Sequence, residues 1–310
     1  MLIYLEGIEN PISFDGAEAL ALVLKKVLRG WSVREVKEAG EGDVTPRIRL
    51  RLGPRGFERR SPWIEAGAAL VLHDPVDAVC DLLLDLERAY VEDASKRSKE
   101  GRGEAVLSIL HAGAVEMGTG TGTGRGTGTG RGTGTGKGLV VFPSTHATGK
   151  SLLTVALAHA GHRLFADDQL PIVTGVRTLG VAPGFLPRLR RPLPEGVDAD
   201  LAAFVRAHEG PQSARFRYVD LDEKRLAPLA TRAPIKGVVL LERSDGATPK
   251  IKPASEAEVL KACVLQSFGR KQNALEVLDS LHAMVQGAKC VKLVYGEAHE
   301  AVALLEEMFA

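Results

Sequence analysis

The chain has 310 residues, of which 45% are apolar, with a mean hydropathy of -0.01 and a formal net charge of +1. This length suits two domains of a soluble globular protein, and the near-zero charge gives no reason to expect nucleic acid or an anionic membrane as the main partner. No apolar run approaches the roughly 20 residues of a spanning helix, and three widely spaced cysteines favour neither a zinc site nor a disulfide framework.

Residues 1–98 are expected to form a small α+β domain. The N-terminal sequence MLIYLEGIENP lacks the basic start and long apolar core of a signal peptide, so cytoplasmic residence is expected. Trp31 and Trp63 are expected in the core or at a domain interface, with peptide recognition as the alternative. Apolar periodicity predicts strands and helices at these positions: strands at Leu2–Leu5, Trp31–Val36, Arg47–Leu52 and Gly56–Ser61, and helices at Ala17–Leu28 and Ala78–Tyr90.

The charged stretch 92–104 has no apolar face, and residues 99–104 are expected to be the linker to a second domain at 105–310. That domain begins with an apolar strand, residues 105–115, which contains His111. A lone histidine on a strand is usually structural.

Residues 118–138 alternate Gly and Thr and hold 11 of the chain's 34 glycines. Such a segment buries too little apolar area to offset its ordering entropy, which predicts a disordered expansion at the tip of a hairpin. The alternative is a cationic flap over nucleotide or substrate, since Arg125, Arg131 and Lys137 interrupt the alternation.

Residues 138–168 predict a strand, a loop, a helix and a second strand that ends in two acids. Gly138–Phe142 is an apolar strand, Gly149-Lys150-Ser151 opens an apolar helix that Gly161 closes, and residues 162–166 lead to Asp167-Asp168. This arrangement is typical of a nucleotide-phosphate site.

The chemistry of each position supports that interpretation. The first amides of a helix carry partial positive charge, and a glycine lets the backbone approach a phosphate closely. Lys150 supplies a cation for the outer phosphates, and the Ser151 hydroxyl suits a Mg²⁺ shell. The full phosphate-loop pattern has Gly five residues before Gly149, where this chain has Ser144, and an ordinary βαβ unit is the alternative.

Beyond Asp168 the pattern continues as a mixed α/β domain. Pro187–Pro192 reads as a rigid basic loop whose arginines suit phosphate, with a solvated basic turn as the alternative. The remaining predicted elements are short strands within Leu170–Val181, strands at Phe216–Asp220, Gly237–Leu241 and Cys290–Tyr295, and helices at Glu256–Phe268, Ala274–Val285 and Ala298–Met308. Arg270 and Lys271 could contact nucleotide, but a surface position is favoured.

Three stretches resemble the HPr serine kinase/phosphorylase family, and more closely its related serine kinases. They are Gly149-Lys150-Ser151 with Gly161-His162-Arg163-Leu164 before Asp167-Asp168, the upstream Leu110-His111-Ala112-Gly113-Ala114-Val115, and the downstream Gly184–Arg190 with Leu193-Pro194. The resemblance covers about residues 105–310 and says little about residues 1–98. It implies a phosphate-loop kinase domain akin to phosphoenolpyruvate carboxykinase, preceded here by the small α+β domain.

The resemblance implies an ATP- and Mg²⁺-dependent serine kinase that acts on a protein or peptide hydroxyl. It makes Asp168 the general base, places Asp167 with Ser151 at the metal, and has His111, Lys150, Arg188 and Arg190 stabilise the transferring phosphoryl group. Neighbours on a strand point to opposite faces, so at most one aspartate is expected to reach the substrate. The nucleotide would be held by Ser144, Thr145, His146, Ala147, Thr148, Gly149, Lys150, Ser151 and Leu152.

Family members that also catalyse the reverse reaction carry an acidic Glu-x-Arg-Gly-Leu-Gly stretch after the aspartates. The corresponding residues here, Thr174–Pro183, contain no acid, which predicts kinase activity without phosphorylase activity. Two alternatives stay open, a nucleotide-binding regulator without transfer activity and a small-molecule kinase. The acceptor is not identified by the sequence, and a homo-oligomer is left open.

Overall fold

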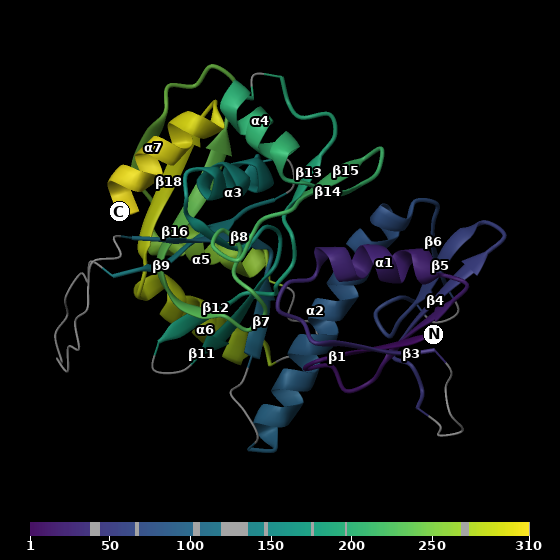
Figure 1. Cartoon of the computed structure of the whole chain (residues 1–310). Helices are drawn as coiled ribbons and strands as arrows, with labels where there is room; N and C mark the ends of the chain where they lie inside the picture. Colours follow the sequence, from purple (N-terminus) through teal and green to yellow (C-terminus); the bar gives the residue numbers. More distant parts are fainter. Residues whose placement is uncertain are drawn as a thin grey trace.

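The computed structural model describes residues 1–37, 44–65, 68–101, 106–118, 136–145, 148–174, 177–195, 197–267 and 273–309. Within them the chain is a mixed α/β protein built on three sheets (Figure 1). None of the helices in these ranges is both long and apolar enough to cross a membrane.

The first sheet has six strands in the order β3-β1-β2-β4-β5-β6. Its strands are β1 (Leu2–Leu5), β2 (Ile12–Asp15), β3 (Val33–Val36), β4 (Ile48–Gly53), β5 (Gly56–Arg60) and β6 (Leu70–Leu72). Two helices belong to this part of the chain, α1 (Glu18–Val27) and α2 (Pro75–Lys99). The predicted strands and α1 are present, and β2, β6 and the full length of α2 are additions to the prediction.

Helix α2 begins and ends differently from the sequence prediction. Asp74 accepts hydrogen bonds from the backbone N–H groups of Val76 and Asp77, and Pro75 occupies the first turn, which together define the start. The helix then runs through Lys99, so the charged stretch from residue 92 is helical and the predicted linker at 99–104 begins inside the helix. Residues 102–104 lie outside the described residues.

Long-range ion pairs hold the charged end of α2, together with the buried apolar residues Val91 and Ala94. Arg47 pairs with both Glu92 and Asp93, and buried Asp93 also accepts a hydrogen bond from the Glu9 backbone at 2.9 Å. Partners so distant in sequence leave no local periodicity, which is why composition alone suggested a linker.

The second sheet has nine strands, of which seven follow the order β10-β8-β9-β16-β12-β11-β7, while β18 pairs with β16 and with β17. The strands are β7 (Val106–Leu110), β8 (Ala112–Met117), β9 (Gly138–Pro143), β10 (Arg163–Ala166), β11 (Leu170–Thr174), β12 (Thr178–Val181), β16 (Arg232–Arg243), β17 (Lys250–Pro253) and β18 (Lys289–Tyr295). Strand β9 is parallel to β16, and β16 is parallel to β18. The ends of these three strands therefore meet at one edge of the sheet.

Both faces of β9 are covered, which explains its continuous apolar sequence. Val140 and Phe142 belong to the core cluster that contains α3 (Lys150–His159) and α7 (Ala298–Phe309). Leu139 and Val141 belong to the cluster that contains α5 (Glu256–Leu265) and α6 (Ala274–Gln286).

A three-stranded sheet in the order β13-β15-β14 lies beside α4 (Ala199–Ala207) (Figure 1). Its strands are β13 (Arg188–Arg190), β14 (Glu209–Gln212) and β15 (Phe216–Val219). The predicted basic loop at 187–192 is thus wrong in part, because Arg188–Arg190 pairs with β15 as a strand. Short length and charge hid the strand from the periodicity argument.

The part of the chain that forms the first sheet contacts residues 183–186, which lie just before β13. The Trp31 indole donates a hydrogen bond to the Pro183 carbonyl at 2.9 Å and stacks on the Phe185 ring at 5.9 Å. The Leu186 backbone N–H donates to the Val27 carbonyl at 2.9 Å. Trp31 therefore lies at a contact between the first sheet's part of the chain and residues 183–186, and an interface was one of the two positions predicted for it. This contact holds the segment that leads into Arg188.

A buried ion pair attaches α2 to the first sheet, and its removal is expected to destabilise the protein. Arg59 Nη1 lies 2.8 Å from Asp85 Oδ2, with side-chain exposures of 8% and 2%. Arg59→Ala leaves the buried Asp85 carboxylate with only the longer contact to Arg88, at 3.7 Å, which costs about 3 kcal/mol of unfolding free energy. Denaturant unfolding measures the loss.

The matched control for Arg59 is Arg51, whose pair with Asp15 spans 3.9 Å and is 69% and 81% exposed. Arg51→Ala is expected to cost about 0–1 kcal/mol, because solvent screens an exposed pair. Equal losses for the two variants would contradict the assignment of Arg59–Asp85 as the contact that holds α2.

Candidate functional site

A cleft of ≈ 680 Å³ lies where the parallel strands β9, β16 and β18 end. One wall is the loop and helix start that follow β9, and the opposite wall comes from α2, β13 and the segment after β13. Open α/β sheets bind ligands at this edge, beyond the carboxyl ends of parallel strands.

The loop reaches the helix through Gly149, which has a left-handed backbone with φ +83°. The N-cap of helix α3 is Gly149, which has no side chain to cap the first N–H groups, and no capping side chain is present among the described residues. Tyr295, at the end of β18, donates from Oη to the Thr148 carbonyl at 3.0 Å and so braces the loop from behind. The helix start therefore has a geometry that suits an anion.

Lys150 sits at the first position of α3 with only 6% exposure. Its Nζ lies 3.3 Å from Asp168 Oδ1, yet it has no hydrogen bond of normal geometry to any described residue. Burial lowers the pKa of Lys150, against the raising effect of the charges of Asp168 and Asp167. An ammonium that makes one long ion pair at the wall of a cleft has donors left for an anionic ligand.

Asp168 follows β10 and points into the cleft. Its carboxylate accepts from His111 Nε2 at 2.9 Å and lies 3.7 Å from Arg188 Nη2, in addition to Lys150. Burial opposes ionisation, but the His111 hydrogen bond and the charges of Lys150 and Arg188 outweigh it and hold the pKa of Asp168 well below its usual range. Asp168 is therefore an ionised carboxylate at neutral pH.

Asp167 points away from the cleft. Its Oδ2 accepts from the Arg188 backbone N–H at 2.9 Å, and its Oδ1 lies 3.4 Å from Thr154 Oγ1. Burial, reinforced by the charge of Asp168, raises the pKa of Asp167, while hydrogen bonds from Arg188 and Ser151 lower it. The two neighbouring carboxylates thus occupy different environments.

His111 lies between β7 and β8, not within one strand as expected from its sequence. The chain changes partners here, because β7 pairs with β11 and β8 pairs with β9 and β10. The ring Nδ1 lies 2.8 Å from Gln266 Oε1, and the His111 backbone N–H donates to the Gln266 carbonyl at 2.8 Å. Since a carboxylate only accepts, the Nε2 that faces Asp168 carries a proton.

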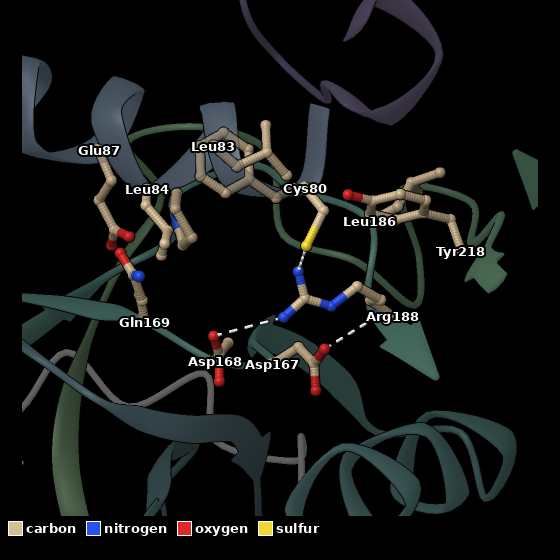
Figure 2. Close-up of a pocket in the computed structure, with 12 residues that line it drawn as sticks. Cys80, Leu83, Leu84, Glu87, Asp167, Asp168, Gln169, Leu186, Arg188 and Tyr218 are labelled. Carbon is tan, nitrogen blue, oxygen red and sulfur yellow. Dashed lines mark hydrogen bonds and ion pairs between the residues drawn. The ribbon is translucent and has the colours of Figure 1, made fainter. Parts of the chain in front are cut away.

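Arg188 joins the cleft to α2 (Figure 2). Its guanidinium contacts Cys80 Sγ on α2 and the Asp168 carboxylate, and it lies over the Phe216 ring at 4.9 Å. Burial raises the pKa of the Cys80 thiol to about 11, although the Arg188 charge lowers it, so the thiol is uncharged. Arg188 is held on three sides beside Asp168.

A smaller pocket of ≈ 50 Å³ lies behind Asp168, against α2 (Figure 2). Glu87 lines it with 2% exposure, and its Oε1 has no hydrogen-bond partner among the described residues. Burial, with the charge of Asp168, raises the pKa of Glu87 well above its usual value. Glu87 therefore lies close enough to Asp168 for the two carboxyl groups to disfavour each other's charge.

Most of the site residues expected from the sequence come together at the cleft. They are His111, Thr145, Thr148, Gly149, Lys150, Ser151, Leu152, Asp168, Arg188 and Arg190. Ser144 does not line it; buried Ser144 accepts a hydrogen bond from Thr148 Oγ1 at 2.8 Å. His146 and Ala147 lie outside the described residues, as do Phe268, Arg270 and Lys271.

Several contributors were not expected. Arg243 lines the cleft at the end of β16, and its Nε donates to the Gly296 carbonyl at 3.1 Å. Gln266, Tyr295 and the face of α2 that carries Cys80 are further additions. Of these residues, only Arg243 could have been predicted from the sequence. It follows the expected strand Gly237–Leu241, and parallel strands bring their carboxyl ends to one edge of a sheet.

No cluster of three or more His, Cys, Asp or Glu side chains that could hold a metal ion occurs in the described ranges. Oxygen donors are nevertheless present, because Ser151 lines the cleft and its side chain hydrogen-bonds to Asp167. Such a hydroxyl–carboxylate pair suits Mg²⁺, which keeps several waters and binds few protein groups when phosphates are present.

No protein-family model and no curated protein matches the chain. Among solved structures, the HPr(Ser) kinase/phosphatase from Coxiella burnetii aligns with a TM-score of 0.29 and 11% identity, over 64% of this chain and 92% of that chain. This structural neighbour is too weakly similar to support an inference about fold or activity.

Proposed function

We propose that this protein is an ATP- and Mg²⁺-dependent serine kinase, similar to the HPr-kinase-related enzymes, that transfers the γ-phosphate to a protein or peptide hydroxyl. In this proposal residues 105–310 form a phosphate-loop kinase domain, and the small α+β domain at 1–98 contributes to acceptor recognition. The observation that carries the proposal is the buried Lys150 ammonium at the start of α3, whose one ion pair in the described part of the chain is to the ionised Asp168 at 3.3 Å.

Each side chain has a role that its position allows. Lys150 and the first amides of α3 bind phosphate oxygens, and Arg188, held by Cys80 and Phe216, stabilises charge on the transferring group. Asp168 accepts the proton of the acceptor hydroxyl, while His111, positioned by Gln266, orients that carboxylate.

Mg²⁺ would be held through Ser151, with Asp167 acting on the Ser151 hydroxyl or on waters of the metal shell. When bound, the metal neutralises phosphate charge during transfer. Asp167 accepts the Arg188 backbone N–H and contacts Ser151, so it couples the helix start to the strand that carries Arg188. Asp168, which faces the cleft, therefore acts as the base that accepts the hydroxyl proton.

We further propose that the protein phosphorylates its acceptor but does not catalyse the reverse reaction, phosphorolysis of the phosphorylated acceptor. The segment after the aspartates, Thr174–Pro183, carries no acid that could assist phosphorolysis. A phosphorylated acceptor incubated with phosphate and Mg²⁺ should therefore keep its phosphate.

The test of the proposed function is incubation of the full chain with γ-labelled ATP, Mg²⁺ and candidate peptides or proteins. Nucleotide binding by calorimetry and label on an acceptor serine, located by mass spectrometry, are the expected results. Absence of ATP binding would exclude the kinase, and binding without transfer to any acceptor would favour a regulatory protein.

Gly149→Ala is expected to weaken ATP binding about tenfold, because it alters the helix start. A Cβ at this position would lie 2.7 Å from Tyr295 Oη and 3.1 Å from Arg243 Cδ, in addition to the left-handed strain of about 1–2 kcal/mol. Isothermal titration calorimetry measures the affinity.

Gly161→Ala is the matched control, since Gly161 also has a positive φ, +100°, but a Cβ there meets no atom within 4 Å. It should lower the melting temperature by strain alone and leave ATP affinity unchanged. The same affinity loss in both variants would show that general strain, not the loop geometry, governs binding.

A further inference from the structure

Strand β13, which carries Arg188, has one edge along which no further strand pairs within the described residues. It is the last strand of its sheet, and among the described residues only β15 pairs with it. The Arg191 N–H donates to the Arg215 carbonyl, and the Val219 N–H donates to the Pro187 carbonyl, each at 2.9 Å. In an antiparallel ladder this places residues 187, 189 and 191 in the bonded pairs with β15.

The backbone groups of Arg188 and Arg190 therefore point away from β15. The Arg188 N–H on that side already donates to Asp167 Oδ2 at 2.9 Å, so this end of the edge lies against Asp167 and that N–H is not available to a peptide. The Arg188 carbonyl and the N–H and carbonyl of exposed Arg190 continue the same edge, along the wall of the cleft. They form a short template for one more strand.

The charged side chains that line the cleft indicate which class of acceptor would bind there. Seven basic side chains line it, Arg88, Lys150, Arg188, Arg190, Arg191, Arg215 and Arg243, against three acids, Asp77, Asp81 and Asp168. Lys150 and Arg243 lie on the phosphate-loop side, whereas Arg88, Arg190, Arg191 and Arg215 lie on the other. Asp77 is already engaged, because its Oδ1 accepts from Ser213 Oγ at 2.6 Å.

Arg190 is the arginine most available to an acceptor. It follows Arg188 by two residues on the same face of β13, and its side chain makes no hydrogen bond or ion pair with the described residues. Two residues of strand span about 7 Å. An extended peptide whose hydroxyl lies at Asp168, beside Arg188, would thus place its second neighbour opposite Arg190.

We propose that the acceptor binds as an extended peptide strand along the open edge of β13, with an acidic residue two positions from the phosphorylated serine that Arg190 binds. This rests on the proposed kinase activity and adds its acceptor class. It also separates the two arginines, because Arg188 contacts Asp168 whereas Arg190 reads the peptide. Backbone pairing supplies affinity and the arginines supply selectivity.

The test uses the full chain, ATP, Mg²⁺ and synthetic peptides with a single serine, in which each flanking position is Asp, Ala or Lys in turn. We expect kcat/KM to be about tenfold higher with Asp than with Lys two positions from the serine, since like charges would otherwise face each other. Arg190→Glu should reverse this ratio. Because both peptides are compared in the same variant, a general loss of rate does not affect the result.

Arg206→Glu is the control, since Arg206 is exposed at the end of α4 and does not line the cleft. It should leave the Asp-to-Lys ratio unchanged. An Asp preference that persists in Arg190→Glu would overturn the assignment of Arg190.

A second set of peptides tests the strand pairing itself. N-methylation of one backbone amide at a time should reduce kcat/KM at alternate positions only, since every second N–H of an added strand faces β13. Tolerance of N-methylation throughout would exclude the added strand, as would ATP binding without phosphorylation of any peptide. Failure to bind ATP at all would instead overturn the underlying kinase.

Discussion

Asp168→Asn is expected to lower the rate of phosphoryl transfer by about 10²–10⁴, with little change in ATP affinity. The substitution keeps the shape of the side chain but removes the negative charge that accepts the hydroxyl proton. It also removes the ionic contacts to Lys150 at 3.3 Å and Arg188 at 3.7 Å. Single-turnover transfer with saturating ATP separates this loss from nucleotide binding.

Asp167→Asn is the companion variant and identifies which aspartate is the base. The amide oxygen of Asn can still accept the Arg188 backbone N–H, so the local structure is preserved. Transfer should fall less than in Asp168→Asn, and the Mg²⁺ concentration needed for half-maximal rate should rise. The opposite ranking would make Asp167 the base.

The pH dependence follows from the direction of the Asp168 shift. A pKa held below its usual range keeps the carboxylate ionised as the pH falls from about 8 to 6, so protonation of the base does not slow transfer in that interval. In wild-type protein kcat/KM should show no acidic limb from this group. An apparent pKa near 7 that disappears in Asp168→Asn would contradict the assignment.

Local signals in the sequence were sufficient for most elements of the fold. The apolar run of β9 and the apolar helix α3, with its glycines at 149 and 161, were found because each leaves a pattern within a few residues. Elements held by distant partners were missed. Strand β13 has only three residues, and the last turns of α2 depend on Arg47.

The same distinction applies to the candidate site. The loop, Lys150 and Asp168 lie within one stretch of chain, so their motif was recognisable from spacing. Gln266 contacts His111 across 155 positions, and Cys80 contacts Arg188 across 108. Such contacts depend on topology, which periodicity does not encode. The turn between β7 and β8 at His111 was lost for the same reason, since both flanking strands are apolar.

The buried amine of Lys150 represents a conflict between stability and function. Removing an ammonium from water costs several kcal/mol, and the ion pair of Lys150 with Asp168 at 3.3 Å offsets only part of this cost, since the pKa of Lys150 is still lowered. Protein interiors tolerate such groups when they act on a ligand, and apolar replacement then leaves the fold about as stable while activity is lost. The behaviour of Lys150 therefore tests its role in a way that loss of activity alone does not.

Lys150→Met is expected to lower ATP affinity and transfer together, with kcat/KM falling by about 10²–10³ or more, because the cation that binds the outer phosphates is absent. The same variant should unfold at a temperature close to that of wild type, since removal of a desolvated amine offsets the loss of its ion pair, and Asp168 keeps its contacts with His111 and Arg188. Calorimetric melting and ATP titration measure the two effects. Lys96→Met, which removes an exposed lysine paired with Glu9 at 2.8 Å, should change neither transfer nor ATP affinity. A Lys150→Met protein that melts several degrees lower, yet still binds ATP normally, would make Lys150 a structural residue and remove the basis for the phosphate site.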